Sequence, residues 1–209
     1  MGIRGNLILL AFSIVVFGCS PLAPRPDQTK FFILAPLSDP ASAPISTAAL
    51  SSQLSIGLGP INFPGYLRRS QVVTRTARGQ IELSAEDRWG EPLDRNFKRV
   101  LSENLAELLN TYRIHQYPWS SMTPLDYVVT VDVRNFETTS DGGSELKAIW
   151  IIKDGRNGRD LYVSETNANT PTNGANGVSV ALSSDLATLS RAISSQMKEL
   201  SQQQGAALN

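Results

Sequence analysis

The first half of the chain carries short stretches that are apolar throughout or in which apolar residues alternate with polar or small ones, both typical of β-strands. These stretches predict strands at residues 30–36, 54–61, 71–76 and 80–84. The turn-forming residues at 77–80 predict that the last two strands form a hairpin. Gly57 and Gly59 lie in the second stretch, where Pro60 follows at once and no third glycine completes a nucleotide-binding loop. We expect these two glycines to allow a close approach to the strand backbone.

Two longer stretches repeat apolar residues every three or four positions, the period of an amphipathic helix. The first helix is expected to begin after Pro92, with Asp94 as its N-terminal cap. The second is expected to begin near Ser183 or Ser184 and to end at residues 202–205. The first apolar stripe contains Leu93, Phe97, Val100, Leu101, Leu105, Ala106 and Leu108, and the second contains Leu182, Leu186, Leu189, Ile193, Met197 and Leu200.

Between these helices the alternation predicts a strand at residues 112–119 and then a β-meander. The sequences Asp141-Gly142-Gly143 and 154–158 are turn signals that separate the strands of the meander. Residues 165–179 are polar and rich in turn formers, so we expect a mobile contact loop there. The meander strands are predicted at residues 127–134, 146–152 and 160–164.

Many short strands together with two amphipathic helices predict an α/β domain in which helices cover a mixed sheet, with an α+β arrangement as the alternative. The long helix between two strands requires at least one crossover connection. The length of the chain favours a single globular domain, predicted at residues 30–203, followed by a flexible tail at 204–209.

The N-terminal segment has the parts of a secretory signal peptide. Arg4 precedes an apolar run at residues 7–17, which is too short for a membrane span of about 20 residues. Val16-Phe17-Gly18-Cys19 resembles the lipobox of bacterial lipoproteins, in which the cysteine becomes the acylated N-terminus. We therefore predict a signal peptide at residues 1–18 and a lipidated, proline-rich linker at 19–29; the alternative is a signal peptide without lipidation.

The composition narrows the possible functions. The chain has 19 basic and 19 acidic side chains, a balance that argues against nucleic acid as a partner. Cys19 is the only cysteine, so its acylation leaves no thiol for a disulfide, a catalytic nucleophile or a zinc site, and no cofactor is expected. His115 is the only histidine, and no Gly-x-Ser-x-Gly motif accompanies it. These features favour a protein that is not an enzyme.

Several motifs along the mature chain, in this order, carry a resemblance to a known family. They are residues 64–75 (PGYLRRSQVVTR), 88–93 (RWGEPL), 117–119 (YPW), 133–137 (VRNFE), 146–150 (LKAIW) and 183–190 (SSDLATLS). Together with the lipobox, they resemble the ABC-type transport auxiliary lipoproteins, the PqiC family. The resemblance implies a three-layer α/β fold similar to the N-terminal domain of TolB. It also implies no established catalytic residues.

The same resemblance implies a location and partners. Ser20 rather than aspartate follows Cys19, which in this class of lipoproteins favours the outer membrane, facing the periplasm. The expected partner is a tunnel protein with a mammalian-cell-entry (MCE) domain, which carries lipid between two membranes, together with its inner-membrane component. A continuous tunnel favours a homo-oligomer, in the form of a ring.

Six residues of the motifs are candidates for partner binding, each with an ordinary structural alternative. We expect Tyr66 and Leu67 to be exposed on a turn, where they either meet a partner or only shape the turn. Arg68 and Arg69 form a solvated corner or face phospholipid headgroups or an acidic partner. Arg88 is expected to pair with Glu91, and Trp89 packs at the start of the helix or lines a ligand site.

Three functions remain open at this point. The first is a docking subunit that holds the tunnel protein at the outer membrane through Cys19. The second is a lipoprotein that binds phospholipid in an apolar pocket between sheet and helix. The third is an exported hydrolase that uses His115.

Overall fold

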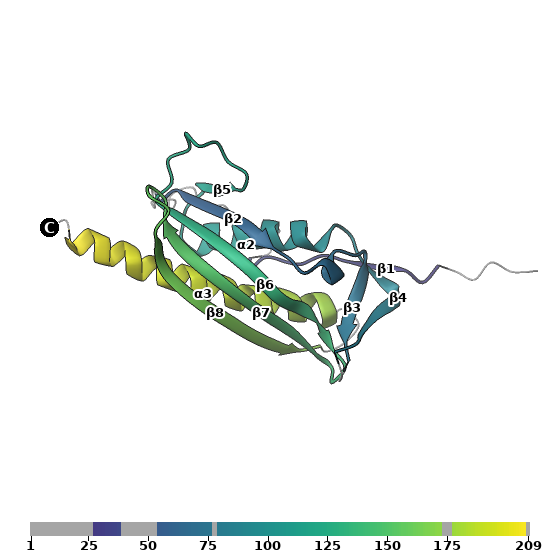
Figure 1. Cartoon of the computed structure of the whole chain (residues 1–209). Coiled ribbons are helices and arrows are strands. Elements are labelled where there is room, and N and C mark those ends of the chain that lie inside the picture. The colour runs from purple at the N-terminus through teal and green to yellow at the C-terminus, as the bar shows by residue number, and fades with distance from the viewer. Residues whose placement is uncertain (1–26, 39–53, 77–78, 173–176, 208–209) are drawn as a thin grey trace, which may run out of the picture.

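The computed structural model describes residues 27–38, 54–76, 79–172 and 177–207 (Figure 1). Cys19 and the predicted signal peptide at residues 1–18 lie outside the described residues. The helices are α2 (Leu93–Leu108) and α3 (Gly177–Ala207), and one turn of 3₁₀-helix, η3, covers Gly65–Leu67. The strands are β1 (Lys30–Phe32), β2 (Ile56–Asn62), β3 (Gln71–Arg75), β4 (Ile81–Trp89), β5 (Ile114–Gln116), β6 (Tyr127–Thr139), β7 (Gly143–Asp154) and β8 (Asp160–Pro171).

Strand β6 organises a single mixed sheet of eight strands. Along one edge β6 pairs with β7 in antiparallel fashion, and β8 continues this meander. Along its other edge β6 pairs in parallel first with β2 and then, at residues 138–139, with β3. Strand β5 extends the sheet beyond β2, whereas β4 and β1 extend it beyond β3. The predicted fold class is confirmed: a mixed open sheet with two helices.

The core lies on one face of the sheet. Leu146, Ala148, Trp150 and Ile152 of β7 are buried, and they alternate with half-exposed residues as the period-two pattern predicted. Helices α2 and α3 pack against each other and cover this face (Figure 1). Phe97 of α2 reaches the sheet and forms an edge-to-face contact with the Phe136 ring, 5.1 Å between ring centroids.

An extended segment at residues 33–38 crosses the outer side of the two helices. The backbone N–H groups of Leu34 and Leu37 donate to the side-chain oxygens of Asn96 and Asn104 at 2.7 and 2.8 Å. These two bonds hold the segment against α2. The sequence interpretation assigned no role to these two asparagines, although they interrupt the apolar face of α2 eight residues apart.

Several predicted boundaries were wrong. The expected loop at 165–179 contains the second half of β8 and the start of α3, with 173–176 outside the described residues. The stretch was predicted as a loop because it is polar. It forms a strand nevertheless, since β8 is an edge strand whose inward positions hold small side chains such as Thr166 and Ala168. Helix α3 also continues past the expected end to Ala207. Asp94 does not cap α2, because Pro92 occupies the N-cap position and no side chain bonds there.

Candidate docking surfaces at the two ends of the sheet

The first candidate surface lies at the end of the sheet where the described chain begins (Figure 1). The Trp89 N–H donates to the Ser70 carbonyl at 2.7 Å, and the Gly90 N–H donates to the Phe32 carbonyl at 2.8 Å. These bonds bring the turn after η3 beside the start of α2 and leave an open groove of about 430 Å³ between them. The groove is lined by Arg68, Arg69, Ser70, Trp89, Gly90, Glu91, Pro92, Asp94 and Arg95.

The groove contains three of the six residues predicted to bind a partner. Arg68 and Arg69 are exposed on its rim, and Trp89 lines it although only 6% of that residue is exposed. Leu67 was expected to be exposed, which was wrong: it is 1% exposed and belongs to the core. Because η3 turns Leu67 inward, this residue fixes the turn that carries the two arginines.

The predicted ion pair between Arg88 and Glu91 was also wrong. The Arg88 guanidinium donates to the backbone carbonyls of Ser84, Ala85 and Asp87 at 2.7 to 3.0 Å. It thereby stabilises a bulge in β4, where the pairing with β3 is interrupted. Glu91 instead accepts a hydrogen bond from Arg99 of α2, with 3.2 Å between nitrogen and oxygen.

Tyr66, the remaining candidate, belongs to a polar cluster on the other face of the sheet. Its hydroxyl donates to Glu137 at 3.0 Å and accepts from Arg75 at 2.9 Å. Glu137 also pairs with Arg75 and accepts from the Phe136 N–H at 2.7 Å, so this buried carboxylate is well supplied with donors. Burial, followed by the nearby Glu137 charge, raises the pKa of Tyr66. The phenol therefore stays protonated and remains a donor.

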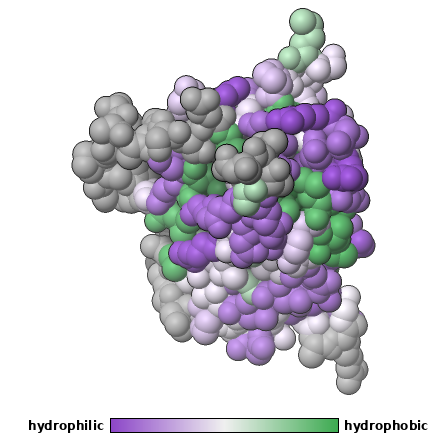
Figure 2. Space-filling view, turned by 90° about the vertical axis from the view of Figure 1, so that its left-hand side faces the viewer, coloured by the Kyte–Doolittle hydropathy of each residue, from purple (hydrophilic) through white to green (hydrophobic). Residues whose placement is uncertain are grey.

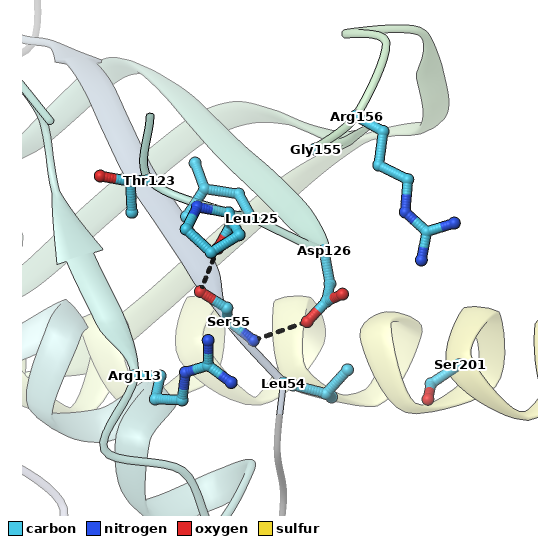
Figure 3. Close-up of a pocket in the computed structure, with 10 residues that line it drawn as sticks. Leu54, Ser55, Arg113, Thr123, Leu125, Asp126, Gly155, Arg156 and Ser201 are labelled. Atoms are coloured by element: carbon cyan, nitrogen blue, oxygen red, sulfur yellow. Dashed lines mark hydrogen bonds between the residues drawn. The ribbon is translucent and has the colours of Figure 1, made fainter. Parts of the chain in front are cut away.

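The second candidate surface is a hollow of about 750 Å³ at the opposite end of the sheet, where α3 ends (Figures 1 and 3). Its floor is fixed by Ser55, whose N–H donates to the Asp126 carboxylate at 2.8 Å and whose hydroxyl donates to the Pro124 carbonyl at 2.7 Å. Figure 3 shows Arg113 and Arg156 on opposite sides of this floor. The lining residues are Leu54, Ser55, Arg113, Thr123, Pro124, Leu125, Asp126, Gly155, Arg156 and Ser201.

Sequence reasoning missed this hollow because its residues come from five separate segments and form no motif. The local signal was Gly155, since a Cβ at this position would overlap the carbonyl oxygen of Leu125. The close approach of the β7–β8 turn to Leu125 thus requires glycine. Figure 2, which views this end, shows hydrophilic residues over much of the described surface, with hydrophobic residues gathered in patches between them.

Neither described helix is both long and apolar enough to cross a membrane. Within residues 27–38, 54–76, 79–172 and 177–207, no three His, Cys, Asp or Glu side chains gather as a group that can hold a metal ion.

The fold defines a class of protein: a mixed-sheet domain with a helical layer on one face and open surface grooves at both ends. The chain belongs to the family of ABC-type transport auxiliary lipoprotein components, whose family model matches residues 36–194. This match confirms the resemblance inferred from the motifs. The chain is therefore an auxiliary lipoprotein of a transport system, and its family points to a membrane-anchored location in the cell envelope.

Comparisons with solved structures support the fold. A crystal structure of an uncharacterized protein matches with a TM-score of 0.65 and 18% identity, covering 81% of this chain and 98% of that chain. A Xanthomonas campestris protein of the DUF330 family matches with a TM-score of 0.62 and 12% identity, covering 73% and 88%. At these identities the likeness concerns the fold alone. The comparison with curated proteins gave no match.

Proposed function

We propose that this chain is an outer-membrane-anchored, non-enzymatic subunit of an MCE-type lipid transport system of the PqiABC kind. In this proposal acylated Cys19 holds the domain at the outer membrane, facing the periplasm. The domain docks the periplasm-spanning tunnel protein there and so supports membrane integrity. The observation that carries the proposal is the family match over residues 36–194.

The arrangement of the domain supports a docking role. The described chain begins at Asp27, just before β1, at one end of the domain. In this proposal an anchor at Cys19 holds that end near the membrane. The hollow that contains Arg113 and Arg156 lies at the opposite end of the domain (Figure 1). There it is accessible to a partner that reaches across the periplasm. The exposed Arg156 guanidinium at this hollow favours a partner with acidic side chains.

The core favours docking over the alternative of a phospholipid carrier. A carrier needs an apolar cavity that encloses most of its ligand. Between the sheet and the helices, the side chains of the described residues pack in one continuous buried cluster, including Phe97, Leu101 and Leu189. Both candidate surfaces are open, and of the residues that line them only Trp89 belongs to this cluster.

Homo-oligomerisation is part of the proposal, because several copies around the end of a tunnel would keep it continuous. Native mass spectrometry of the lipidated chain with its tunnel partner should show a complex that contains several copies. A single copy per complex, with and without the partner, would contradict this part.

Capture of the MCE-domain partner by the purified chain tests the docking role. Arg156→Glu reverses a charge at the hollow and should weaken capture about tenfold or more, as loss of a charge-assisted contact does. Arg159→Glu is the matched control, because Arg159 is exposed on the same turn but does not line the hollow. Equal capture by both variants and the unsubstituted chain would exclude this hollow as the docking surface.

A further inference from the structure

Large apolar side chains are exposed at the end of the domain where the chain enters. In the extended segment that begins with β1, Phe31 and Ile33 alternate with the buried residues Phe32 and Leu34. Strand β4 adds two more exposed apolar residues. The exposed fractions are 70% for Phe31, 56% for Ile33, 41% for Leu83 and 39% for Ile81. Such a group at one end of a domain is typical of an interaction surface.

The strand register places Phe31 and Leu83 on the same face of the sheet. Phe31 pairs with Arg88, and Arg88 in turn pairs with Gln71 of β3. Leu83 pairs with Val73, two residues further along β3. Because side chains two residues apart point to the same face of a strand, Phe31, Arg88 and Leu83 share the face that the helices leave uncovered.

The position of this face limits what can cover it. The described chain begins at Asp27, eight residues after Cys19, and eight extended residues span at most about 26–29 Å. The inference therefore rests on the proposed acylation of Cys19, which tethers Asp27, and with it the end of the domain that carries Phe31, to the bilayer. The hydrocarbon interior of that bilayer is then the apolar phase closest to these side chains.

We propose that this face contacts the phospholipid bilayer directly, with Phe31 and Leu83 inserted at the boundary between headgroups and acyl chains. The exposed charges around them have both signs: Lys30, Arg68 and Arg69 against Asp27, Glu82 and Glu86. Apolar insertion rather than attraction to anionic lipid is therefore the main contribution. The contact fixes the orientation of the anchored domain and points its opposite end away from the membrane.

Fluorescence quenching by brominated phospholipids tests this contact in the lipidated full chain bound to vesicles. Phe31→Trp places a reporter at the proposed insertion site. Met122→Trp is the matched control, since Met122 is 89% exposed in the loop between β5 and β6 at the other end. The signal of Trp89, Trp119 and Trp150 is common to all variants and is subtracted by means of the unsubstituted chain.

The expected result is a blue shift and strong quenching of the reporter in Phe31→Trp but not in Met122→Trp, equal in neutral and anionic vesicles and insensitive to salt. If the Phe31→Trp chain floats with the vesicles while its reporter stays unquenched, the anchor is kept and the orientation is overturned. A chain that does not float overturns the anchor as well. Quenching that disappears at high salt contradicts apolar insertion. A blue shift of the Phe31→Trp reporter that depends on protein concentration without vesicles assigns this face to a second copy and overturns the membrane contact.

Discussion

Asp185 of α3 is a carboxylate that is fully buried beneath β7 and β8. It accepts hydrogen bonds from the hydroxyls of Ser144 and Thr170, both at 2.6 Å. Burial raises the pKa of Asp185, and the two hydroxyls oppose this effect without reversing it. The folded protein therefore binds a proton at this position more tightly than the unfolded chain does.

This pKa shift predicts the pH dependence of stability. Since the folded state holds the extra proton, the free energy of unfolding should fall as pH rises from the usual aspartate pKa of 3.8 through the raised folded value, and stay lower above it. Asp185→Asn keeps one acceptor, adds one donor and should remove this decline. Urea unfolding between pH 4 and 8 checks it. If the advantage of the variant shrinks as pH rises, the assignment is wrong.

Asn104 joins three parts of the fold at a single residue. Its oxygen accepts the Leu37 N–H, and its amide nitrogen donates to Ser190 of α3 at 3.0 Å. Asn104→Ala leaves these groups without their partner and should lower the free energy of unfolding by about 1–3 kcal/mol. Denaturant titration checks this value, with Gln203→Ala as the control because Gln203 is an exposed amide on α3. Equal stabilities of the two variants would show that residues 33–38 are held by other contacts.

At the scale of elements, close packing limits which side chain strand β2 can carry at position 57. A Cβ at Gly57 would lie 2.8 Å from Leu125 and 2.9 Å from Trp119, side chains of the loop that follows β5. The expected close approach at the strand glycines is thus confirmed: Trp119 and Leu125 pack directly on Gly57. This loop also supplies Leu125 to the hollow, so the strand and the candidate docking surface are coupled.

Gly57→Ala should therefore destabilise the protein by about 1–3 kcal/mol, because the added methyl group displaces the side chains packed on it. Gly65→Ala is the matched control, since a Cβ at Gly65 meets nothing within 4 Å. Thermal unfolding and the fluorescence of Trp119 provide the measurements. If both variants unfold at the same temperature, the packing on Gly57 has no energetic consequence.

Sequence periodicity predicted most elements because their inward positions are large and apolar. The meander face with Leu146, Trp150 and Ile152 and the stripe on α2 follow directly from this pattern. Where inward positions are small or polar, as in Thr166 and Ala168 of β8, the pattern does not distinguish an edge strand from a loop. The bulge of β4 was missed because Arg88 stabilises it through backbone carbonyls, which carry no sequence signal.

The two candidate surfaces also differ in how far the sequence could predict them. The groove near η3 was partly predicted, because Arg68, Arg69 and Trp89 belong to motifs that are short in sequence. The hollow at the other end was not, because only the sheet topology brings Arg113 and Arg156 to one place. Burial of Leu67 depends on the direction in which η3 turns, and a local sequence pattern does not determine that direction.

At the scale of the whole molecule, a docking subunit needs one end at the membrane and another available to its partner. The domain has two opposite ends that fit this proposal: the described chain begins beside β1 at one end, and the hollow lies beside the end of α3 at the other (Figure 1). Tethering raises the local concentration of the docking surface without adding contacts. In this account the anchor is part of the mechanism, and it predicts that a soluble domain loses function although it folds.

The most direct test is the distribution of the tunnel partner between membrane fractions in cells that carry Cys19→Ala in a form exported to the periplasm. The account predicts a folded domain in the soluble periplasm and loss of the MCE-domain protein from the outer-membrane fraction. With the unsubstituted chain, the partner should be retained there. Full retention of the partner and intact membrane integrity with the soluble domain would contradict the account.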